Sequence, residues 1–261
     1  MSKQKTDIDN TGHRIRLLSY NVQAGISTTR YRHYFTQSWR HLFPHKRRLQ
    51  NLNKIAEIIA GYDVVGLQEV DTGSLRSSFT NLTEYLAEQA DFPFWHDQTN
   101  RKIGRIARHA TGLISRFKPS ETGTHKLPGR IPGRNLLASR FGQKNHSLHI
   151  FVVHLSLGNR ARMEQLAYIK DLVNTCEHVI LMGDMNFKSR SKEMDYLLSH
   201  TRLCEPVHDL HTYPSWGPKK SIDHILVSDQ LAVENVQVLK GFASDHLPIA
   251  MEVRLPGSIH L

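Results

Sequence analysis

Short apolar segments that end in an acidic, amide or imidazole side chain recur along the whole chain. One such segment runs into Asn21, a second into Glu69, a third into His154 and a fourth into Asp184. Continuous apolar runs of this length are typical of strands that are buried on both faces in an α/β protein. Strand ends are also where an α/β scaffold can hold reactive groups rigidly. The pattern therefore predicts an α/β fold with one functional site at an edge of its sheet.

Predicted helices alternate with predicted strands in both halves of the chain, and no obvious linker divides it. The spacing of apolar residues predicts helices at about residues 44–60, 82–89 and 160–173. A chain of 261 residues can still form one domain. We expect a flexible tail at residues 1–13 and a single catalytic domain at residues 14–261. The strands are expected at residues 14–20 and 63–68, around residue 94, and at residues 111–115, 135–141, 147–155, 179–183, 222–227, 233–239 and 248–253.

The net charge of +10 is concentrated in two segments that are almost free of acidic residues. Residues 10–56 contain no Asp or Glu, and residues 98–163 contain only Glu121. Clustered positive charge raises the local concentration of anionic ligands, although a merely solubilising surface is the alternative. Because the two segments flank the polar strand ends, the sequence favours an anionic substrate.

The chain has two cysteines, Cys176 and Cys204, which are too few for a disulfide framework and favour a reducing compartment. The first residues are polar and lack the apolar core of a signal peptide. No apolar run is as long as a membrane span. We therefore expect a cytoplasmic protein without a transmembrane segment.

Glu69 is a candidate metal ligand. A carboxylate directly after a buried strand is costly unless it is paired or binds a metal. Mg²⁺ is the natural partner, because it takes one or two carboxylates together with substrate phosphate oxygens and water. Asn21 could supply an amide oxygen to the same cation, or it could be a simple turn residue.

The segment around Asp184 has a stronger pattern. Gly183 lets the backbone approach a neighbour closely, and a two-residue step places Asp184 and Asn186 on the same side of an extended chain. The carboxylate can orient an attacking water or take its proton, while the amide donates to a phosphate oxygen. The alternative is a turn in which both residues act as local caps.

An acid–histidine pair is expected between Asp223 and His246. His246 belongs to Ser244-Asp245-His246-Leu247-Pro248, which lies at the end of the last core strand. A buried Asp fixes the tautomer of a histidine and stabilises its charged form. His154 offers a second imidazole, for phosphate binding or for protonation of a leaving oxygen.

Six short motifs carry a resemblance to a known family: Asn21, Gln68-Glu69, His154-Leu155, Gly183-Asp184-Met185-Asn186, Asp223-His224-Ile225 and Ser244-Asp245-His246-Leu247-Pro248. In this order they resemble the endonuclease/exonuclease/phosphatase superfamily. That superfamily includes DNase I-like nucleases, abasic-site endonucleases, neutral sphingomyelinases and inositol polyphosphate 5-phosphatases. The resemblance covers about residues 14–254. It implies a DNase I-like, four-layer α/β/β/α sandwich, with two mixed sheets flanked by helices.

The resemblance also implies a metal site. Glu69 would bind the catalytic Mg²⁺, or Mn²⁺ as an alternative, with help from Asn21. Asp245 would sit beside the metal, through a water molecule or directly. The metal would stabilise developing negative charge as a Lewis acid.

The remaining positions would act on the substrate. The resemblance implies that Asp184 orients or activates the attacking water and that Asn186 holds a phosphate oxygen. His246, supported by Asp223, would stabilise the phosphorane or transfer a proton. His154 would bind phosphate or assist the leaving group.

Two departures narrow the subclass. Abasic-site endonucleases usually carry an Asp where this chain has Gln23, and a Tyr where it has His154. Both differences point toward the DNase I-like, sphingomyelinase-like or general phosphodiesterase branches.

The sequence thus predicts a monomeric Mg²⁺-dependent phosphoesterase that hydrolyses phosphodiester bonds, with nucleic acid as the favoured substrate because basic loops can contact its phosphates. The alternative is a lipid or headgroup phosphodiesterase or phosphatase. It is suggested by aromatic and basic residues within 27–44, which could lie on an anionic membrane or pack on the core. A catalytically silent binding module is a third possibility, but every expected catalytic position holds a suitable residue.

Overall fold

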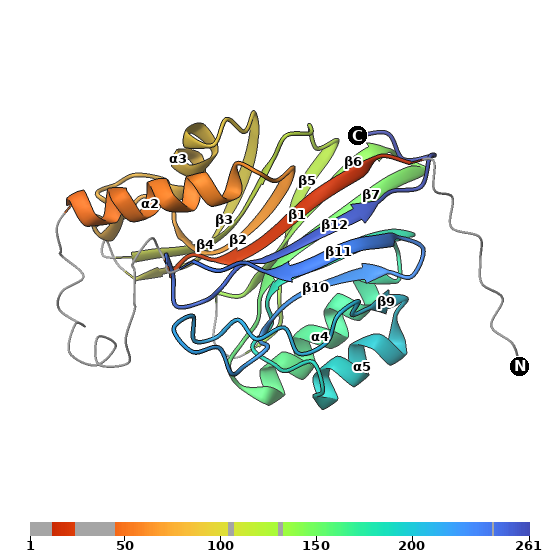
Figure 1. The fold of residues 1–261 in the computed structure, drawn as a ribbon. Helices are drawn as coiled ribbons and strands as arrows, with labels where there is room; N and C mark the ends of the chain where they lie inside the picture. Colours follow the sequence, from red (N-terminus) through yellow and green to blue (C-terminus); the bar gives the residue numbers. More distant parts are fainter. Residues whose placement is uncertain (1–11, 24–44, 104–106, 130–132, 242) are drawn as a thin grey trace, which may run out of the picture.

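Two six-stranded sheets lie face to face, and helices cover both outer sides (Figure 1). The computed structural model describes residues 12–23, 45–103, 107–129, 133–241 and 243–261. The aromatic and basic face expected within residues 27–44 lies outside the described residues, as does most of the expected tail. The four-layer α/β/β/α sandwich expected from the sequence is confirmed.

The first sheet has the strand order β11–β12–β1–β2–β4–β3. Only β1 and β2 pair in parallel, and the other pairs in this sheet are antiparallel. The strands are β1 (Arg14–Asn21), β2 (Val64–Asp71), β3 (Phe94–Ile103), β4 (Ala107–Ser115), β11 (Ala232–Val238) and β12 (Ile249–Arg254).

The second sheet has the order β5–β6–β7–β8–β10–β9, and β7 and β8 form its parallel pair. Its strands are β5 (Glu121–Lys126), β6 (Asn135–Gln143), β7 (His146–His154), β8 (His178–Asp184), β9 (Leu203–Cys204) and β10 (Asp223–Ser228). β5 was not predicted from the sequence, because its residues are polar and none of them is buried.

Four α-helices form the outer layers of the described structure. α2 (His45–Ile59) and α3 (Leu82–Gln89) cover the first sheet, while α4 (Asn159–Val173) and α5 (Lys192–His200) cover the second (Figure 1). Three apolar clusters fill the three interfaces between layers: one under α2 and α3, one between the sheets and one under α4 and α5. Each fully buried Leu, Ile or Val in them contributes about 1.5–3 kcal/mol relative to an exposed side chain.

The strand directions bring the polar strand ends to one edge of the sandwich. Parallel pairing places Asn21 beside Gln68 in the first sheet and His154 beside Asp184 in the second. β10 runs antiparallel to β8, so its first residue, Asp223, pairs with Asp184. The two sheets also approach closely at Gly66, where a Cβ atom would lie 2.9 Å from Cε of Met182.

Candidate active site

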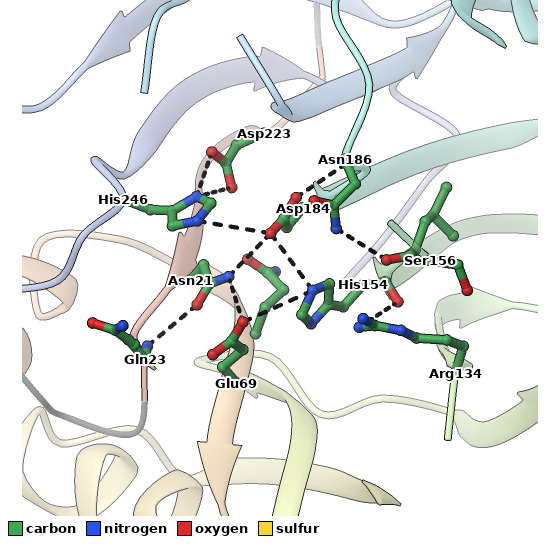
Figure 2. Close-up of polar contacts among 12 residues, drawn as sticks. Asn21, Gln23, Glu69, Arg134, His154, Ser156, Asp184, Asn186, Asp223 and His246 are labelled. Atoms are coloured by element: carbon green, nitrogen blue, oxygen red, sulfur yellow. Dashed lines mark hydrogen bonds and ion pairs between the residues drawn. The ribbon is translucent and has the colours of Figure 1, made fainter. Parts of the chain in front are cut away.

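Side chains from both sheets converge at this edge (Figure 2). The Asn21 amide joins the two sheets: its Nδ2 donates to Oδ2 of Asp184 at 3.1 Å and lies 3.4 Å from Oε1 of Glu69. The Asn21 side-chain oxygen accepts from the backbone N–H of Gln23 at 3.2 Å. One buried amide therefore fixes a carboxylate of each sheet.

Glu69 lies in a β-bulge within β2, whereas the sequence placed it directly after the strand. The pairing of β2 with β4 shifts between Gln68 and Val70, so Glu69 is the extra residue. Its φ is 56°, a left-handed conformation that costs a non-glycine residue about 1–2 kcal/mol. A bulge redirects a side chain out of the regular alternation. This strained backbone turns Glu69 toward the site.

Asp184 is buried among other acids. Burial, together with the charges of Asp223 and Glu69, raises the pKa of Asp184 to about 7, against the lowering effects of His246 and Asn21. The pKa of Asp245 is raised in the same way to about 6, by burial and by Glu69. The site therefore holds more negative charge than its own basic groups neutralise.

His246 and Asp223 form the expected acid–histidine pair. Nδ1 of His246 lies 2.8 Å from Oδ2 of Asp223, and the Thr212 hydroxyl donates to the same oxygen. Burial alone would lower the pKa of His246, but Asp223, Asp184 and Asp245 raise it to about 10. His246 is therefore an imidazolium at neutral pH. The segment that carries it leads into β12 instead of ending a strand, and it reaches the same edge because β12 runs antiparallel to β1.

His154 is held in the neutral form. Burial, Arg134, His246 and His109 lower its pKa well below the ordinary value. Its Nε2 lies 3.6 Å from Oδ2 of Asp184 and 3.9 Å from Oε1 of Glu69. These distances are too long for hydrogen bonds, and a neutral ring forms no ion pair. His154 therefore faces the carboxylates as an uncharged imidazole.

Asn186 lies beside Asp184 on a turn, not on the extended chain that the two-residue step suggested. Its φ is 56° and its backbone N–H donates to Oδ1 of Asp184 at 3.0 Å. The side-chain Nδ2 donates to the carbonyl oxygen of Leu155, also at 3.0 Å. An amide has two N–H groups, so the second one can still bind a substrate oxygen.

The sequence did not single out two basic groups near His154. Arg134 donates from Nη1 to the His154 carbonyl oxygen at 3.3 Å, and His109 is close enough to lower the pKa of His154. Other members of the basic segments are structural. Arg162 forms a buried ion pair with Glu193 at 2.6 Å, and Arg116 donates to backbone carbonyls after α2. The density of basic residues in the sequence does not distinguish those near the site from those that hold the fold together.

The donor chemistry of the site fits a hard divalent cation. Asp184, Asp223 and His246 bring possible ligand atoms within 4.8 Å of one another. However, an imidazolium has no free lone pair for a metal, and Asp223 is already bonded to His246 and Thr212. The carboxylate oxygens of the half-buried Glu69 and the buried Asp245 suit Mg²⁺ or Mn²⁺ better.

Close packing beside Asp184 gives a stability prediction. Gly183 has a φ of 142°, and a Cβ atom there would overlap the carbonyl oxygen of Val153 on β7. We expect Gly183→Ala to lower the free energy of unfolding by about 3 kcal/mol or more in urea titrations, since backbone must move. Gly123→Ala is the control, because no atom lies within 4 Å of its added methyl group. An unchanged urea midpoint for Gly183→Ala would contradict this packing.

The sequence family of this chain defines its class, a hydrolase of phosphoester bonds. The chain belongs to the endonuclease/exonuclease/phosphatase family, whose sequence model matches residues 18–246. No functionally curated protein matches the chain. In the described part of the chain, no helix has both the length and the apolar character needed to cross a membrane.

Solved structures share the fold at low sequence identity. A mannosyl-6-phosphatase from Bacteroides thetaiotaomicron is 18% identical, with a TM-score of 0.69 over 92% of this chain and 99% of that one. The human nocturnin catalytic domain, with a bound sulfate anion, is 17% identical, with a TM-score of 0.67 over 93% of each chain. A humanized TDP2 from D. rerio is also 17% identical, with a TM-score of 0.65 over 92% and 99%.

Proposed function

We propose that this protein is a Mg²⁺- or Mn²⁺-dependent phosphoesterase that hydrolyses phosphodiester bonds, with nucleic acid as its favoured substrate. The observation that carries the proposal is the meeting of an acid-rich group, Glu69, Asp184 and Asp245, with a charged Asp223–His246 pair at one sheet edge. A phosphoester needs both kinds of group, since it is an anion attacked by water.

Glu69 and Asp245 would hold the cation, and the Asn21 amide would orient them or add its oxygen. When bound, the metal neutralises negative charge on the phosphoryl oxygens as a Lewis acid. A cation held there would also offset the repulsion among the clustered carboxylates.

The chain's own residues then divide the proton transfers. Asp184 would accept a proton from the attacking water, and its burial, the largest cause of its raised pKa, favours the protonated form of the carboxyl. The His246 imidazolium donates to a phosphoryl oxygen, and Asp223 keeps it charged and oriented. Asn186 holds a second phosphate oxygen, and the neutral His154 contacts the phosphate or the leaving oxygen.

The choice of nucleic acid rests on charge and on the two sequence departures. Arg134 and His109 add positive potential next to His154, and basic side chains contribute affinity through phosphates. Gln23 and His154 weigh against abasic-site repair. The second candidate function is a lipid or headgroup phosphodiesterase or phosphatase, and a mannosyl-6-phosphatase among the similar structures supports its phosphatase form. We further propose a monomer that acts in the cytoplasm.

A substrate panel tests this proposal. Bis-para-nitrophenyl phosphate, para-nitrophenyl phosphate, double- and single-stranded DNA, RNA, sphingomyelin and inositol phosphates are incubated with Mg²⁺ or Mn²⁺. We expect hydrolysis of the diester and of at least one nucleic acid. Turnover of the monoester or of sphingomyelin alone would favour the second candidate, and no turnover of any substrate would contradict the proposed function.

A further inference from the structure

A second buried acid–histidine pair lies behind the site. His224 follows Asp223 in β10, and only 2% of its side chain is exposed. Its Nδ1 lies 2.8 Å from Oε1 of Glu205, and its Nε2 lies 2.8 Å from the carbonyl oxygen of Phe187. Both ring nitrogens are thus within hydrogen-bond distance of an oxygen atom. The ring therefore bridges the side chain of Glu205 and the backbone carbonyl of Phe187.

Glu205 also contacts Ser189, which lies two residues after Phe187. Its Oε1 also accepts from the Ser189 hydroxyl at 2.8 Å, and its Oε2 contacts Nδ1 of His208. Burial alone would raise the pKa of Glu205, but His224, His208 and Ser189 hold it below the ordinary value. The Phe187 ring stacks on His224 with 5.5 Å between the ring centroids.

Phe187 and Ser189 both belong to the turn that follows Asp184 (residues 185–189). Asn186 lies in this turn with a left-handed backbone, which a non-glycine residue keeps only where its surroundings hold it. On the other side, the Met185 N–H donates to the Ile222 carbonyl oxygen at 2.9 Å. β10 and the chain just before it thus fasten the turn on both sides of Asn186.

We propose that His224, held by Glu205, is a positioning residue that fixes the turn carrying Asn186. The inference rests on the proposed function, in which Asn186 holds a phosphate oxygen. A buried pair of polar side chains is a poor means of stabilising a fold, because apolar residues of the same volume often do so equally well. Its value here is geometric: one rigid ring sets the place of the Phe187 carbonyl and, through Glu205, of Ser189.

His224→Gln tests the proposal, since an amide side chain cannot bridge Glu205 and Phe187 as the ring does. We expect kcat for bis-para-nitrophenyl phosphate to fall about 100-fold with KM changed less than about threefold, because a displacement near 1 Å costs that much. His208→Gln is the matched control. It removes the more exposed contact to Glu205 and leaves both bonds to the turn, so kcat should stay within about twofold.

A double-mutant cycle separates positioning from general stabilisation. If His224 acts through Asn186, His224→Gln should add little to the loss in Asn186→Ala, whereas independent effects multiply. Hydrogen exchange in the metal-free protein adds a readout without catalysis. The Met185 and Asn186 amides should exchange faster in His224→Gln and not in His208→Gln.

Multiplied losses, an unchanged kcat or unchanged exchange would each overturn the proposal. Should His224→Gln fail to fold, Ser189→Ala cuts the bond from the other end of the turn and is put through the same measurements. If the wild-type protein hydrolyses no phosphoester, the proposed function fails, and hydrogen exchange still decides whether His224 holds the turn.

Discussion

Replacing Asp184 by Asn is expected to lower kcat by about 1,000-fold or more, because the amide cannot accept a proton from water and general bases contribute 10²–10⁴ in rate. The side chain is buried and accepts bonds from Asn21 and Asn186, so the substitution keeps its size but loses one acceptor. The kcat is measured on bis-para-nitrophenyl phosphate with saturating Mg²⁺. Activity close to that of the wild type would remove Asp184 from the reaction.

The same variant should change how stability depends on pH in the metal-free protein. The pKa of Asp184 is raised from 3.8 to about 7, so the folded state binds this proton more tightly than the unfolded state does. The bound proton therefore stabilises the folded state. This contribution to the free energy of unfolding is fully present below about pH 4 and is lost as pH rises through about 7, by up to roughly 4 kcal/mol. We therefore expect the free energy of unfolding, measured with urea in the presence of a chelator, to fall less between pH 5 and pH 8 in Asp184→Asn than in the wild type. Some loss of stability should remain in the variant, because Asp245 also has a raised pKa, of about 6.

Asp223→Asn is expected to have the second large effect. Without the carboxylate, His246 loses the largest influence that raises its pKa, so its pKa should fall from about 10 toward the ordinary 6.5. The raised pKa of His246 contributes stability below about pH 6.5 that disappears as pH rises through about 10, and the variant lacks it at pH 7. We expect kcat at pH 7 to fall about 10⁴-fold, as for other acid–histidine pairs.

Nitrogen-detected NMR of His246 in the metal-free protein checks the cause directly. The wild-type ring should stay protonated through pH 8, and the Asp223→Asn ring should not. Thr212→Val is the control, since it removes only the hydroxyl that donates to Asp223 and should have a much smaller effect on the pKa of His246. A wild-type His246 that titrates near pH 6.5 would contradict this account.

Much of the fold could be predicted because the buried strands are continuously apolar and their polar ends stand out. Asn21, Glu69, His154 and Asp184 were found in this way, and the structure brings them together with Asp223 and His246. Their catalytic roles remain predictions. The short helix α5 was not predicted.

Other features depend on contacts between distant parts of the chain, which no local pattern shows. The bulge at Glu69 exists only in the pairing of β2 with β4. His224 gains its partners from Glu205 and Phe187, which lie on other segments. Likewise, Arg162 is structural only because Glu193 on α5 meets it.

Metal dependence tests the proposed chemistry of the site most directly. Hydrolysis of bis-para-nitrophenyl phosphate at pH 7.5 is measured after chelation and then during Mg²⁺ titration, for the wild type and for Glu69→Gln. The wild type should be inactive in chelator and recover with Mg²⁺, and Glu69→Gln should need about 10- to 100-fold more Mg²⁺ for half of its maximal rate. Full activity in chelator, or identical Mg²⁺ titrations for the two proteins, would contradict a metal-assisted site built around Glu69.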